Sequence, residues 1–465
     1  MNKGSTTIEK LILIDTLERL GVGYHFEQEI EDQLREIFRF QSQDTDQGNY
    51  DLFTTAVQFR VLRQHRYSVS CDVFNKFKGE DGEFEETLTS DTRGLLSLFE
   101  AANVRIHGED ILENAVVFTT HHLKHVVQQL EPRLQCQVKR ALEQPLHRGV
   151  AKVEARHYIS FYEKDESRNE VLLKLAKLDF SYSQNLYKKE LHDLFRWWNE
   201  LDFMSKLPHV RDRLVESYFW GMAFHSHPQH SYARIAVTKS LLMLTVVDDT
   251  YDNYATLEEA DLFTEILENQ TRKTIAVPYA KEAVKQICKA YNKHMNWFMG
   301  GQMPTYEEYI VNTIVTSCIY IFLTMGIPGI KIASKESIDW LMSEPNKALI
   351  ASTRVCRHAN DVGSDERESK GGNMPTAVDC YAKQYGVSKE KTVDKFNELF
   401  ENAWKDFNTE WSIEISTTSK YMMEQLLNHA RVAEVTYRDG RDGYTHPQKY
   451  LAAQIATVFV DPIAI

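Results

Sequence analysis

The sequence predicts an all-α protein built from two helical domains. Its 465 residues include only 20 glycines and 11 prolines, well below their usual share, so few residues interrupt long helices. Apolar residues recur at helical spacing through most of the chain. An apolar content of 43%, with 11% aromatic residues, is enough to form large cores and excludes a disordered chain. Length alone allows roughly two to four domains.

The N-terminal part predicts antiparallel helices joined by short connections. Apolar residues near helical spacing, with charges between them, predict helices over residues 8–40, 52–66, 91–102, 108–119 and 121–129. The polar stretch 153–169 ends in a charged run and marks the expected domain boundary. We therefore expect an N-terminal domain over 1–170 and a C-terminal domain over 171–465.

The C-terminal part predicts a larger helical core. One helix is expected to run from Val237 into an acidic cluster, followed by helices over 279–298, 306–325, 334–342, 347–361 and 387–410. The uncharged stretch 309–330 is long enough for a membrane span. Its asparagine, threonine and serine residues, and the breaks at Gly326 and Pro328, favour a buried core helix instead.

The net charge indicates which binding partners to expect, and the cysteine content indicates the cellular compartment. The net charge of −13 and the pI of about 5.8 argue against general binding of nucleic acid or anionic membranes. A phosphorylated small molecule could still bind if metal ions offset that charge. The six cysteines are scattered without a CxxC pair, which indicates reduced thiols inside a cell rather than disulfides or a zinc site. The first residues show no secretory or transit signal.

Three carboxylates end the helix that includes Val237. Asp248 and Asp252 lie one turn apart on one helix face, and Asp249 adjoins them. A helix C-terminus is the unfavourable end for anions, and like charges so close repel each other. One explanation is Mg²⁺, which takes one or two protein carboxylates and shares its other positions with water and phosphate. The alternative is a solvated acidic helix end.

A second polar face follows later in the chain. Asn360, Ser364 and Glu368 are spaced i, i+4 and i+8, so they project from a single helix face. Three oxygen side chains on one face can chelate Mg²⁺. Asp361, Asp365 and Glu366 point elsewhere and are expected to face solvent.

Three arginines accompany these two faces. Arg211 and Arg213 precede an aromatic run at 218–220, and Arg357 lies about one turn before Asn360. The guanidinium fork matches phosphate oxygens, so the arginines as a set predict a clamp for a diphosphate group. Each arginine alone is explained equally well by a surface ion pair.

These motifs together resemble the class I terpene synthases of plants, most closely the cytosolic sesquiterpene-forming branch. The resemblance rests on DDTYD at 248–252, on the stretch 360–368 and on Arg211-Asp212-Arg213. Stretches 62–65, 218–220, 435–437 and 442–447 are also similar, so the resemblance covers nearly the whole chain. It implies two α-helical domains, of which the C-terminal one is a class I terpenoid synthase helical bundle, or barrel, with the active site.

The resemblance also implies individual roles. Asp248 and Asp252, supported by Asp249, would hold two Mg²⁺ ions, and the second polar face would hold a third, with Mn²⁺ as a substitute. Tyr437 and Asp442 would act in the final proton loss, but ring faces and hydrogen-bonded core tyrosines explain these residues equally well. The other implied residues are the metal ligands Asn360, Ser364 and Glu368, the diphosphate-binding Arg211, Arg213 and Arg357, and the pocket-lining Trp220, Thr316, Ser317, Cys318, Tyr437 and Tyr444.

The implied activity is that of a Mg²⁺-dependent lyase that ionises farnesyl diphosphate and releases diphosphate and a sesquiterpene. Metal ions and arginines would neutralise the leaving group, and aromatic faces would stabilise the carbocation. The protein is expected to be a cytoplasmic monomer that binds a small allylic diphosphate, without nucleic acid or stable membrane insertion. The alternatives are a catalytically impaired truncated synthase, a monoterpene synthase, and a chain-elongating prenyltransferase.

The chain departs from the family in two places. Its first residues match a later family helix, so the N-terminal segment that caps the closed active site is expected to be missing. Asp252 and Asn360 are 108 positions apart, about 30 fewer than in the family, which corresponds to about 45 Å of helix. This shortening falls around residues 268–279. Loss of one wall there would leave both metal motifs in place while the cavity leaks or fails to form.

Overall fold

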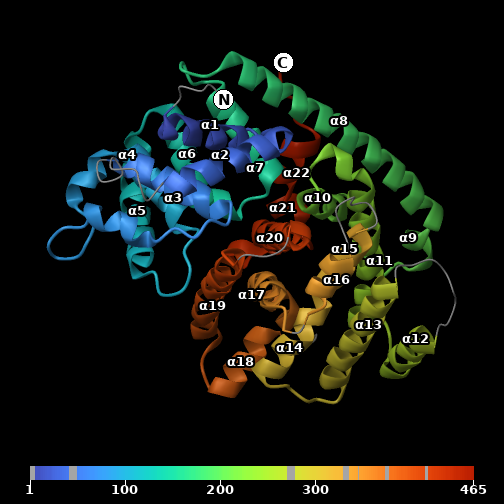
Figure 1. Ribbon diagram of the computed structural model, residues 1–465. Coiled ribbons are helices and arrows are strands. Elements are labelled where there is room, and N and C mark those ends of the chain that lie inside the picture. The colour runs from blue at the N-terminus through green and yellow to red at the C-terminus, as the bar shows by residue number, and fades with distance from the viewer. Residues whose placement is uncertain are drawn as a thin grey trace. The chain divides into compact units, whose positions relative to one another are not determined.

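A computed structural model describes residues 6–40, 50–269, 278–327, 335–343, 345–371, 376–413 and 417–465. These residues form helices and no strand; one isolated bridge joins Lys78 and Phe84. The prediction of an all-α fold is confirmed (Figure 1). Contacts divide the chain into two compact units. The first comprises 1–182, 405–414 and 461–465, and the second comprises 183–404 and 415–460.

The first unit is an array of helices around an apolar core. Its helices are α1 (Thr7–Arg19), α2 (Glu27–Phe40), α3 (Leu52–Gln64), α4 (Thr92–Ala102), α5 (Asp110–Val126), α6 (Pro132–Glu143) and α7 (Ala151–Tyr162). Ile14, Leu34 and Phe59 are among the buried residues of the core. The C-terminal segment 405–414 joins this unit, where Trp411 Nε1 donates to the Gln64 carbonyl over 3.1 Å.

Three of the expected N-terminal helices were wrong. The helix predicted over 8–40 is interrupted after α1, because Gly21 adopts a left-handed φ of 74° that favours glycine. The helices predicted over 108–119 and 121–129 are instead one helix, α5, followed by a single 3₁₀ turn over Val127–Gln129. No glycine or proline separates the two predicted segments, so nothing interrupts the backbone hydrogen bonds.

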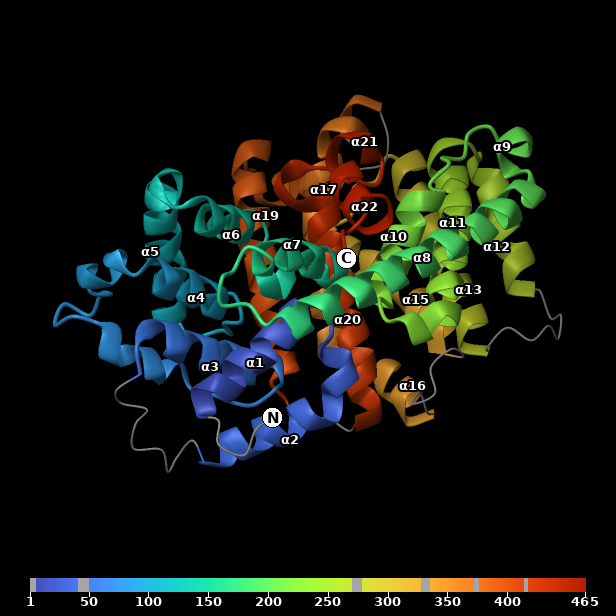
Figure 2. The same ribbon diagram turned by 90° about the horizontal axis from the view of Figure 1, so that it is seen from above.

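The second unit contains the later helices. They are α8 (Glu170–Leu201, which begins in the first unit), α9 (Phe203–Lys206), α10 (Leu214–Phe224), α11 (Ser231–Asn253), α12 (Leu257–Asn269), α13 (Pro278–Met299), α14 (Tyr306–Thr316), α15 (Ile319–Gly326), α16 (Lys335–Leu341), α17 (Lys347–Gly371), α18 (Ala377–Tyr385), α19 (Lys389–Trp411, which ends in the first unit), α20 (Thr417–Tyr437), α21 (Pro447–Tyr450) and α22 (Ala452–Phe459). Helices α10, α11 and α13 lie side by side in both views (Figure 1 and Figure 2), and α17 packs along α20.

A buried ion pair fixes α11, the helix with the first acidic cluster. Arg234 has no exposed surface, and its Nε and Nη2 donate to the two carboxylate oxygens of Glu190 in α8, each over 2.7 Å. The Tyr218 hydroxyl of α10 donates to Glu190 over the same distance. Because a buried charge that lost its partner would be costly, this network holds α8, α10 and α11 in one register.

The long apolar stretch predicted as a core helix is two helices. Residues 306–326 are long and apolar enough to cross a membrane, but 67% of their most apolar window is buried inside the fold. Helix α14 ends at Thr316 and α15 begins at Ile319. Cys318 lies between them with a φ of 63°, a left-handed conformation that ends the first helix.

Candidate active site

The DDTYD cluster occupies the last turns of α11. Buried Val237 and Leu244 hold the preceding turns in the core, and the helix ends at Asn253. Asp249 is 1% exposed, whereas Asp248 is half-buried and Asp252 is exposed. The three carboxylates therefore differ in environment, although they are close in sequence.

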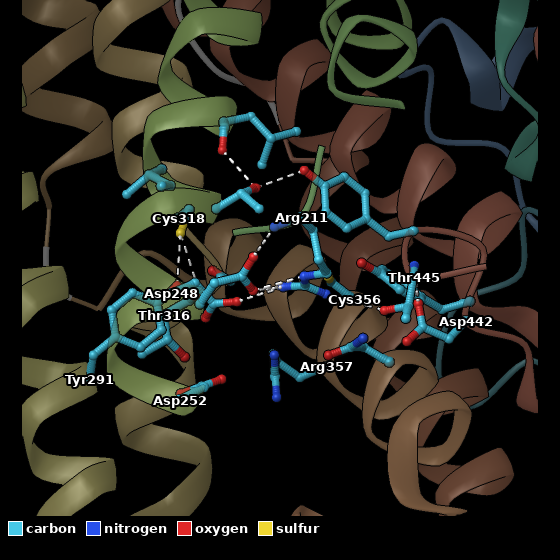
Figure 3. A pocket seen from close by; sticks show the side chains of 18 of the residues that line it. Arg211, Asp248, Asp252, Tyr291, Thr316, Cys318, Cys356, Arg357, Asp442 and Thr445 are labelled. Atoms are coloured by element: carbon cyan, nitrogen blue, oxygen red, sulfur yellow. Dashed lines mark hydrogen bonds and ion pairs between the residues drawn. The ribbon is translucent and has the colours of Figure 1, made fainter. Parts of the chain in front are cut away.

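Arg211 binds two of these carboxylates at once (Figure 3). Its backbone N–H donates to Asp249 Oδ2 over 2.7 Å, and its Nε donates to Asp249 Oδ1 over 2.8 Å. Its Nη2 reaches Asp248 Oδ2 over 3.1 Å, and its Nη1 donates to Thr445 Oγ1 over 3.2 Å. Burial alone would lower the pKa of Arg211, but the Asp248 and Asp249 carboxylates raise it overall. Burial raises the pKa of Asp248 despite the opposing effect of Arg211.

The second polar face, which comprises positions 360, 364 and 368, belongs to α17. Asn360 lines the cavity described below, and Ser364 is 1% exposed. The Ser364 hydroxyl oxygen is buried and makes no hydrogen bond to the part of the chain that the structure describes. Helix α17 extends beyond its predicted end at 361 and includes position 368, but the side chains of Glu366 and Glu368 are outside the described residues.

The expectation that Asp361 and Asp365 face solvent was wrong. Asp361 is 1% exposed and forms an ion pair with Arg357, one turn before it. Asp365 is partly buried and pairs with Lys389 over 3.0 Å. Packing of α17 against α14 and α18 covers the side of the helix that bears Asp361, so its carboxylate needs a cationic partner.

A close approach explains the glycine inside α17. A Cβ atom added to Gly363 would overlap the Arg441 carbonyl oxygen, because the two atoms would be closer than van der Waals contact allows. Only glycine lets the helix backbone come so near the loop 438–446. That loop carries Asp442, Tyr444 and Thr445, all of which line the cavity.

These elements surround a cavity of about 380 Å³ within the second unit. Pockets for small organic ligands range from about 300 to 1,000 Å³. Of the site residues predicted from the sequence, all whose side chains the structure describes line this cavity except Arg213 and Ser364. Arg213 instead donates through its Nη2 to the Thr445 carbonyl over 2.8 Å. The prediction that the cavity fails to form is therefore wrong for the described residues.

Aromatic rings form part of the cavity wall. Trp220 meets Tyr437 edge to face, with ring centroids 6.2 Å apart. The Tyr444 hydroxyl lies 3.0 Å from Ser217 Oγ and 2.8 Å from Thr245 Oγ1, which fixes its ring. Residues 316–318, at the break between α14 and α15, also border the cavity.

Several residues that line the cavity were not predicted from the sequence. Leu241 and Thr245 precede Asp248 and Asp252 at helical spacing, so they share their face of α11 and could have been found from that pattern. Leu244 and Cys356 likewise lie one turn before Asp248 and Asn360 on their helices. The others come from elements that only the fold brings together, and they are His209, Tyr291, His294, Tyr309, Phe322 and Thr445.

The donor set suits a hard divalent cation. Asp248, Asp252 and Asn360 present carboxylate and amide oxygens to one cavity, and oxygen ligands are those that Mg²⁺ prefers. The orphaned Ser364 hydroxyl adds a buried oxygen on the same face as Asn360. Among the described side chains, no three His, Cys, Asp or Glu residues gather closely enough to hold a metal alone. Water and substrate oxygens would have to complete the shell, as is usual for Mg²⁺.

Comparisons with known families agree with this geometry. Residues 1–142 match the "Terpene synthase, N-terminal domain" family, and residues 199–276 and 267–406 match the "Terpene synthase family, metal binding domain". The second family thus matches in two pieces that overlap at 267–276. The two pieces of the match meet where the sequence predicts a shortened segment, around residues 268–279.

Several plant enzymes are similar over almost their whole length. Gamma-cadinene synthase of Ocimum basilicum is 46% identical over 495 aligned positions, which include 99% of this chain and 90% of the relative. Tau-cadinol synthase of Lavandula angustifolia is 44% identical, with 100% and 90% covered. Because 495 positions exceed the 465 residues of this chain, the first relative contains residues that this chain lacks.

Solved structures share the fold. Isoprene synthase from grey poplar, in complex with three Mg²⁺ ions and dimethylallyl-S-thiolodiphosphate, is 31% identical with a TM-score of 0.90, covering 100% of this chain and 94% of that one. A limonene synthase with 2-fluorolinalyl diphosphate is 31% identical with a TM-score of 0.91, covering 99% and 92%. The chain belongs to the terpene synthase family, in the branch of the plant sesquiterpene synthases, which are metal-dependent lyases.

Proposed function

We propose that this sesquiterpene synthase uses farnesyl diphosphate as its substrate and ionises it with the help of three Mg²⁺ ions. One observation carries the proposal. Asp248, Asp252, Arg211, Arg357 and Asn360 line the same cavity, whose other lining residues include the rings of Trp220, Phe322 and Tyr437. A charged diphosphate and a hydrocarbon chain need both kinds of lining within one pocket.

Asp248 and Asp252 would hold two of the ions, with Asp249 in support, and the face formed by Asn360, Ser364 and Glu368 would hold the third. Bound Mg²⁺ neutralises the charge that develops on a departing diphosphate. The Ser364 hydroxyl supports this assignment, since a buried oxygen without a protein partner is a ready ligand. Mn²⁺ takes similar oxygen ligands and is a candidate substitute.

The arginines would receive the diphosphate by exchanging partners. Arg211 binds Asp248 and Asp249, and Arg357 binds Asp361. Cations bound to the Asp248 carboxylate would compete with the Arg211 Nη2 contact and free that nitrogen for phosphate oxygens. The Asp249 contacts would keep the guanidinium aimed at the cavity meanwhile. Arg213, bound to the Thr445 carbonyl, would hold the loop behind the diphosphate.

The remaining walls would protect and guide the carbocation. Trp220, Tyr437 and Tyr444 offer ring faces or edges to the cavity, and ring faces attract cations. Thr316 and Cys318, at the helix break, would add polar backbone next to that wall. Asp442 is 5% exposed and accepts a hydrogen bond from the Thr445 N–H over 2.9 Å. Asp442 and the neighbouring Tyr437 would take part in the final proton loss.

The substrate assignment has a direct test. Purified protein is incubated with farnesyl diphosphate and Mg²⁺, and the volatile products are compared with those of Asp252→Ala and of a sample without enzyme. We expect a sesquiterpene hydrocarbon or alcohol from the parent protein alone. A folded parent sample that yields no such product would rule out the proposed reaction. Geranyl diphosphate in parallel tests the monoterpene alternative.

The protein's context is proposed on the same basis. The acidic net charge of −13 supports a protein that binds neither nucleic acid nor anionic membranes. The cavity lies within one unit, which supports a monomer. The six scattered cysteines without a CxxC pair support a cytoplasmic protein. Light scattering after size-exclusion chromatography tests the monomer, and fractionation of the cells of origin tests the compartment.

A further inference from the structure

Three buried hydroxyl groups meet beside the cavity, at Tyr444 of the loop 438–446. The Tyr444 hydroxyl lies 3.0 Å from Ser217 Oγ of α10 and 2.8 Å from Thr245 Oγ1 of α11. Ser217 is 0% exposed, Thr245 is 5% exposed and Tyr444 is 8% exposed. Thr245 and Tyr444 line the cavity, and none of the roles above is assigned to Ser217 or Thr245. This hydroxyl cluster joins two helices and the loop at one point.

The hydrogen bonds of the hydroxyl cluster run in one direction. Thr245 Oγ1 donates to the Leu241 carbonyl oxygen, one turn earlier in α11, over 3.0 Å. Because a hydroxyl group has one proton, Thr245 accepts from Tyr444, and Tyr444 in turn accepts from Ser217. Each of the three hydroxyls thus donates once, and the series ends on a backbone carbonyl. A buried series in which every proton has an acceptor is rigid, whereas the loss of one member leaves a buried group unsatisfied.

This series decides what Tyr444 offers to the cavity. Its hydroxyl both donates and accepts within the wall, so the ring is the part of Tyr444 that can act on a carbocation. Without the Thr245 oxygen, the Tyr444 proton would lose its buried acceptor, and the ring would have to move to find another one. The position of the ring therefore depends on hydroxyls from two helices.

The loop 438–446 is held in a different way at the next residue. Arg211 donates through its Nη1 to Thr445 Oγ1 over 3.2 Å, and Arg213 donates through its Nη2 to the Thr445 carbonyl over 2.8 Å. Both donors are cations, which a bound diphosphate attracts. The hydroxyls that hold Tyr444 are neutral, so a bound diphosphate or metal ion acts on them far less. The hydroxyl cluster would therefore keep the Tyr444 ring in place while the arginines exchange partners.

We propose that Ser217 and Thr245 are positioning residues that set the place of the Tyr444 ring in the cavity wall and thereby influence which product is formed. The inference rests on the proposed function, because a product distribution exists only where the carbocation forms. It assigns Ser217 and Thr245 no contact with metal ions or diphosphate. Their effect should appear in the order of the loop and in the ratio of products.

The test uses one chemical change at two positions of α11. Thr245→Val removes the hydroxyl and keeps the shape of the side chain. Thr238→Val is the matched control, since Thr238 is 0% exposed and also donates to the carbonyl four residues earlier, that of Arg234, over 2.8 Å. Thr238 is not among the residues that line the cavity. Thr245→Ser keeps the hydroxyl and loses only a methyl group, so it should behave like the parent.

Hydrogen exchange measures the order of the loop without any substrate. The Thr445 N–H donates to Asp442 Oδ1 over 2.9 Å, so its exchange rate reports local opening of the loop. In Thr245→Val this amide should exchange about fivefold faster than in the parent, the factor that corresponds to one ordinary hydrogen bond. Thr238→Val and Thr245→Ser should match the parent.

The products formed from farnesyl diphosphate measure the effect on specificity. Two competing steps of a carbocation differ about fivefold in rate when their barriers differ by the energy of one hydrogen bond. In Thr245→Val the ratio of the two most abundant products should therefore change about fivefold, and in Thr245→Ser it should return to the parent ratio. Thr238→Val should leave the rate and the ratio unchanged.

The proposal is overturned if Thr245→Val exchanges at the parent rate, if Thr238→Val speeds exchange equally, or if the product ratio stays the same. Should Thr245→Val not fold, Ser217→Ala replaces it, because that variant removes the first hydroxyl of the series and leaves every proton with an acceptor. It should change exchange and products in the same direction. A parent protein that forms no product contradicts the proposed function alone, since the exchange rates still decide whether the hydroxyl cluster holds Tyr444.

Discussion

Arg211 and Asp249 are joined by two hydrogen bonds that use both carboxylate oxygens. The backbone N–H and the Nε of Arg211 donate to them over 2.7 and 2.8 Å, and Asp249 is 1% exposed. Such a buried, two-point contact fixes the guanidinium at the mouth of the acidic cluster. Arg211 thereby holds the middle carboxylate of the cluster at two points, and all three carboxylates line the cavity.

Arg211→Lys should weaken binding of diphosphate about tenfold to a hundredfold. An ammonium group cannot reproduce the fork on Asp249, and hydrogen bonds to charged groups contribute about 1.5–3 kcal/mol each. Inhibition of turnover by inorganic diphosphate measures the change. The control is Arg196→Lys, which alters a surface pair with Asp193 at 66% and 48% side-chain exposure. Equal effects of the two variants would contradict a special role for Arg211.

Ser364→Ala should raise the Mg²⁺ concentration needed for half-maximal activity without lowering stability. Its buried oxygen has no hydrogen-bond partner among the described residues, so its removal leaves no protein group unsatisfied. The matched control is Ser352→Ala on the same helix, whose hydroxyl donates to the Leu426 carbonyl over 2.7 Å. That variant should lose about 1 kcal/mol in the free energy of unfolding and keep its Mg²⁺ dependence. The opposite pattern would argue against Ser364 as a ligand.

Gly363→Ala should reduce both stability and activity. The added methyl group would overlap the Arg441 carbonyl and push α17 away from the loop that carries Asp442 and Tyr444. Overpacking of this kind costs about 1–3 kcal/mol. Gly386→Ala serves as the control, since its φ of 64° is strained for alanine but no atom lies within 4 Å of the new Cβ. Chemical denaturation and turnover are measured together, and only the Gly363 variant should lose turnover at a temperature where both remain folded.

The free energy of unfolding should fall as the pH drops below about 6.5. Burial lowers the pKa of His429 to about 3, and the same effect holds for His358. An unfolded histidine titrates near pH 6.5, so between these values the unfolded chain binds a proton that the folded chain excludes. Each such histidine contributes a slope of about 1.4 kcal/mol per pH unit, and its contribution is fully present above pH 6.5.

His429→Phe isolates one of these contributions. The slope of the unfolding free energy against pH is measured between about pH 6 and pH 5. It should decrease by about 1.4 kcal/mol per pH unit, which corresponds to the uptake of one proton on unfolding. Parent and variant are also compared at pH 7.5, where the histidine is neutral in both states, to correct for altered packing. An unchanged slope would contradict the assignment of His429 as a neutral buried group.

Insertion of the relative's additional residues between α12 and α13 should stabilise the protein. Leu262 and Ile266 of α12 are 57% and 50% exposed, and the family match breaks just after them, at 267–276. A segment that covers these side chains would remove apolar surface from water, at about 25 cal/mol per Å². The chimera uses the corresponding residues of gamma-cadinene synthase. If the chimera converts farnesyl diphosphate and the parent does not, the result supports the alternative that this chain is a catalytically impaired truncated synthase. Turnover by both proteins would rule that alternative out.

The sequence alone determined the fold class and most of the site. Helical periodicity and scarce glycine and proline predicted the helices, because the spacing of apolar residues reflects which face each helix buries. The same periodicity placed Asp248 with Asp252, and Asn360 with Ser364, on shared faces. The N-terminal helices that were predicted wrongly differ for two local reasons, namely the left-handed Gly21 and the missing breaker before His121.

Tertiary structure decided what no spacing encodes. The approach of α13 to α11 brings Tyr291 to the cavity that Asp248 also lines, although the two residues are 43 positions apart and share no local pattern. Packing against neighbouring helices buried Asp361 and gave it Arg357 as a partner, although its position on the helix suggested solvent. Gly363 looked out of place in a helix until the Arg441 carbonyl was found beside it. A sequence specifies which groups share one helix face, whereas contacts between helices arise only when those faces pack together.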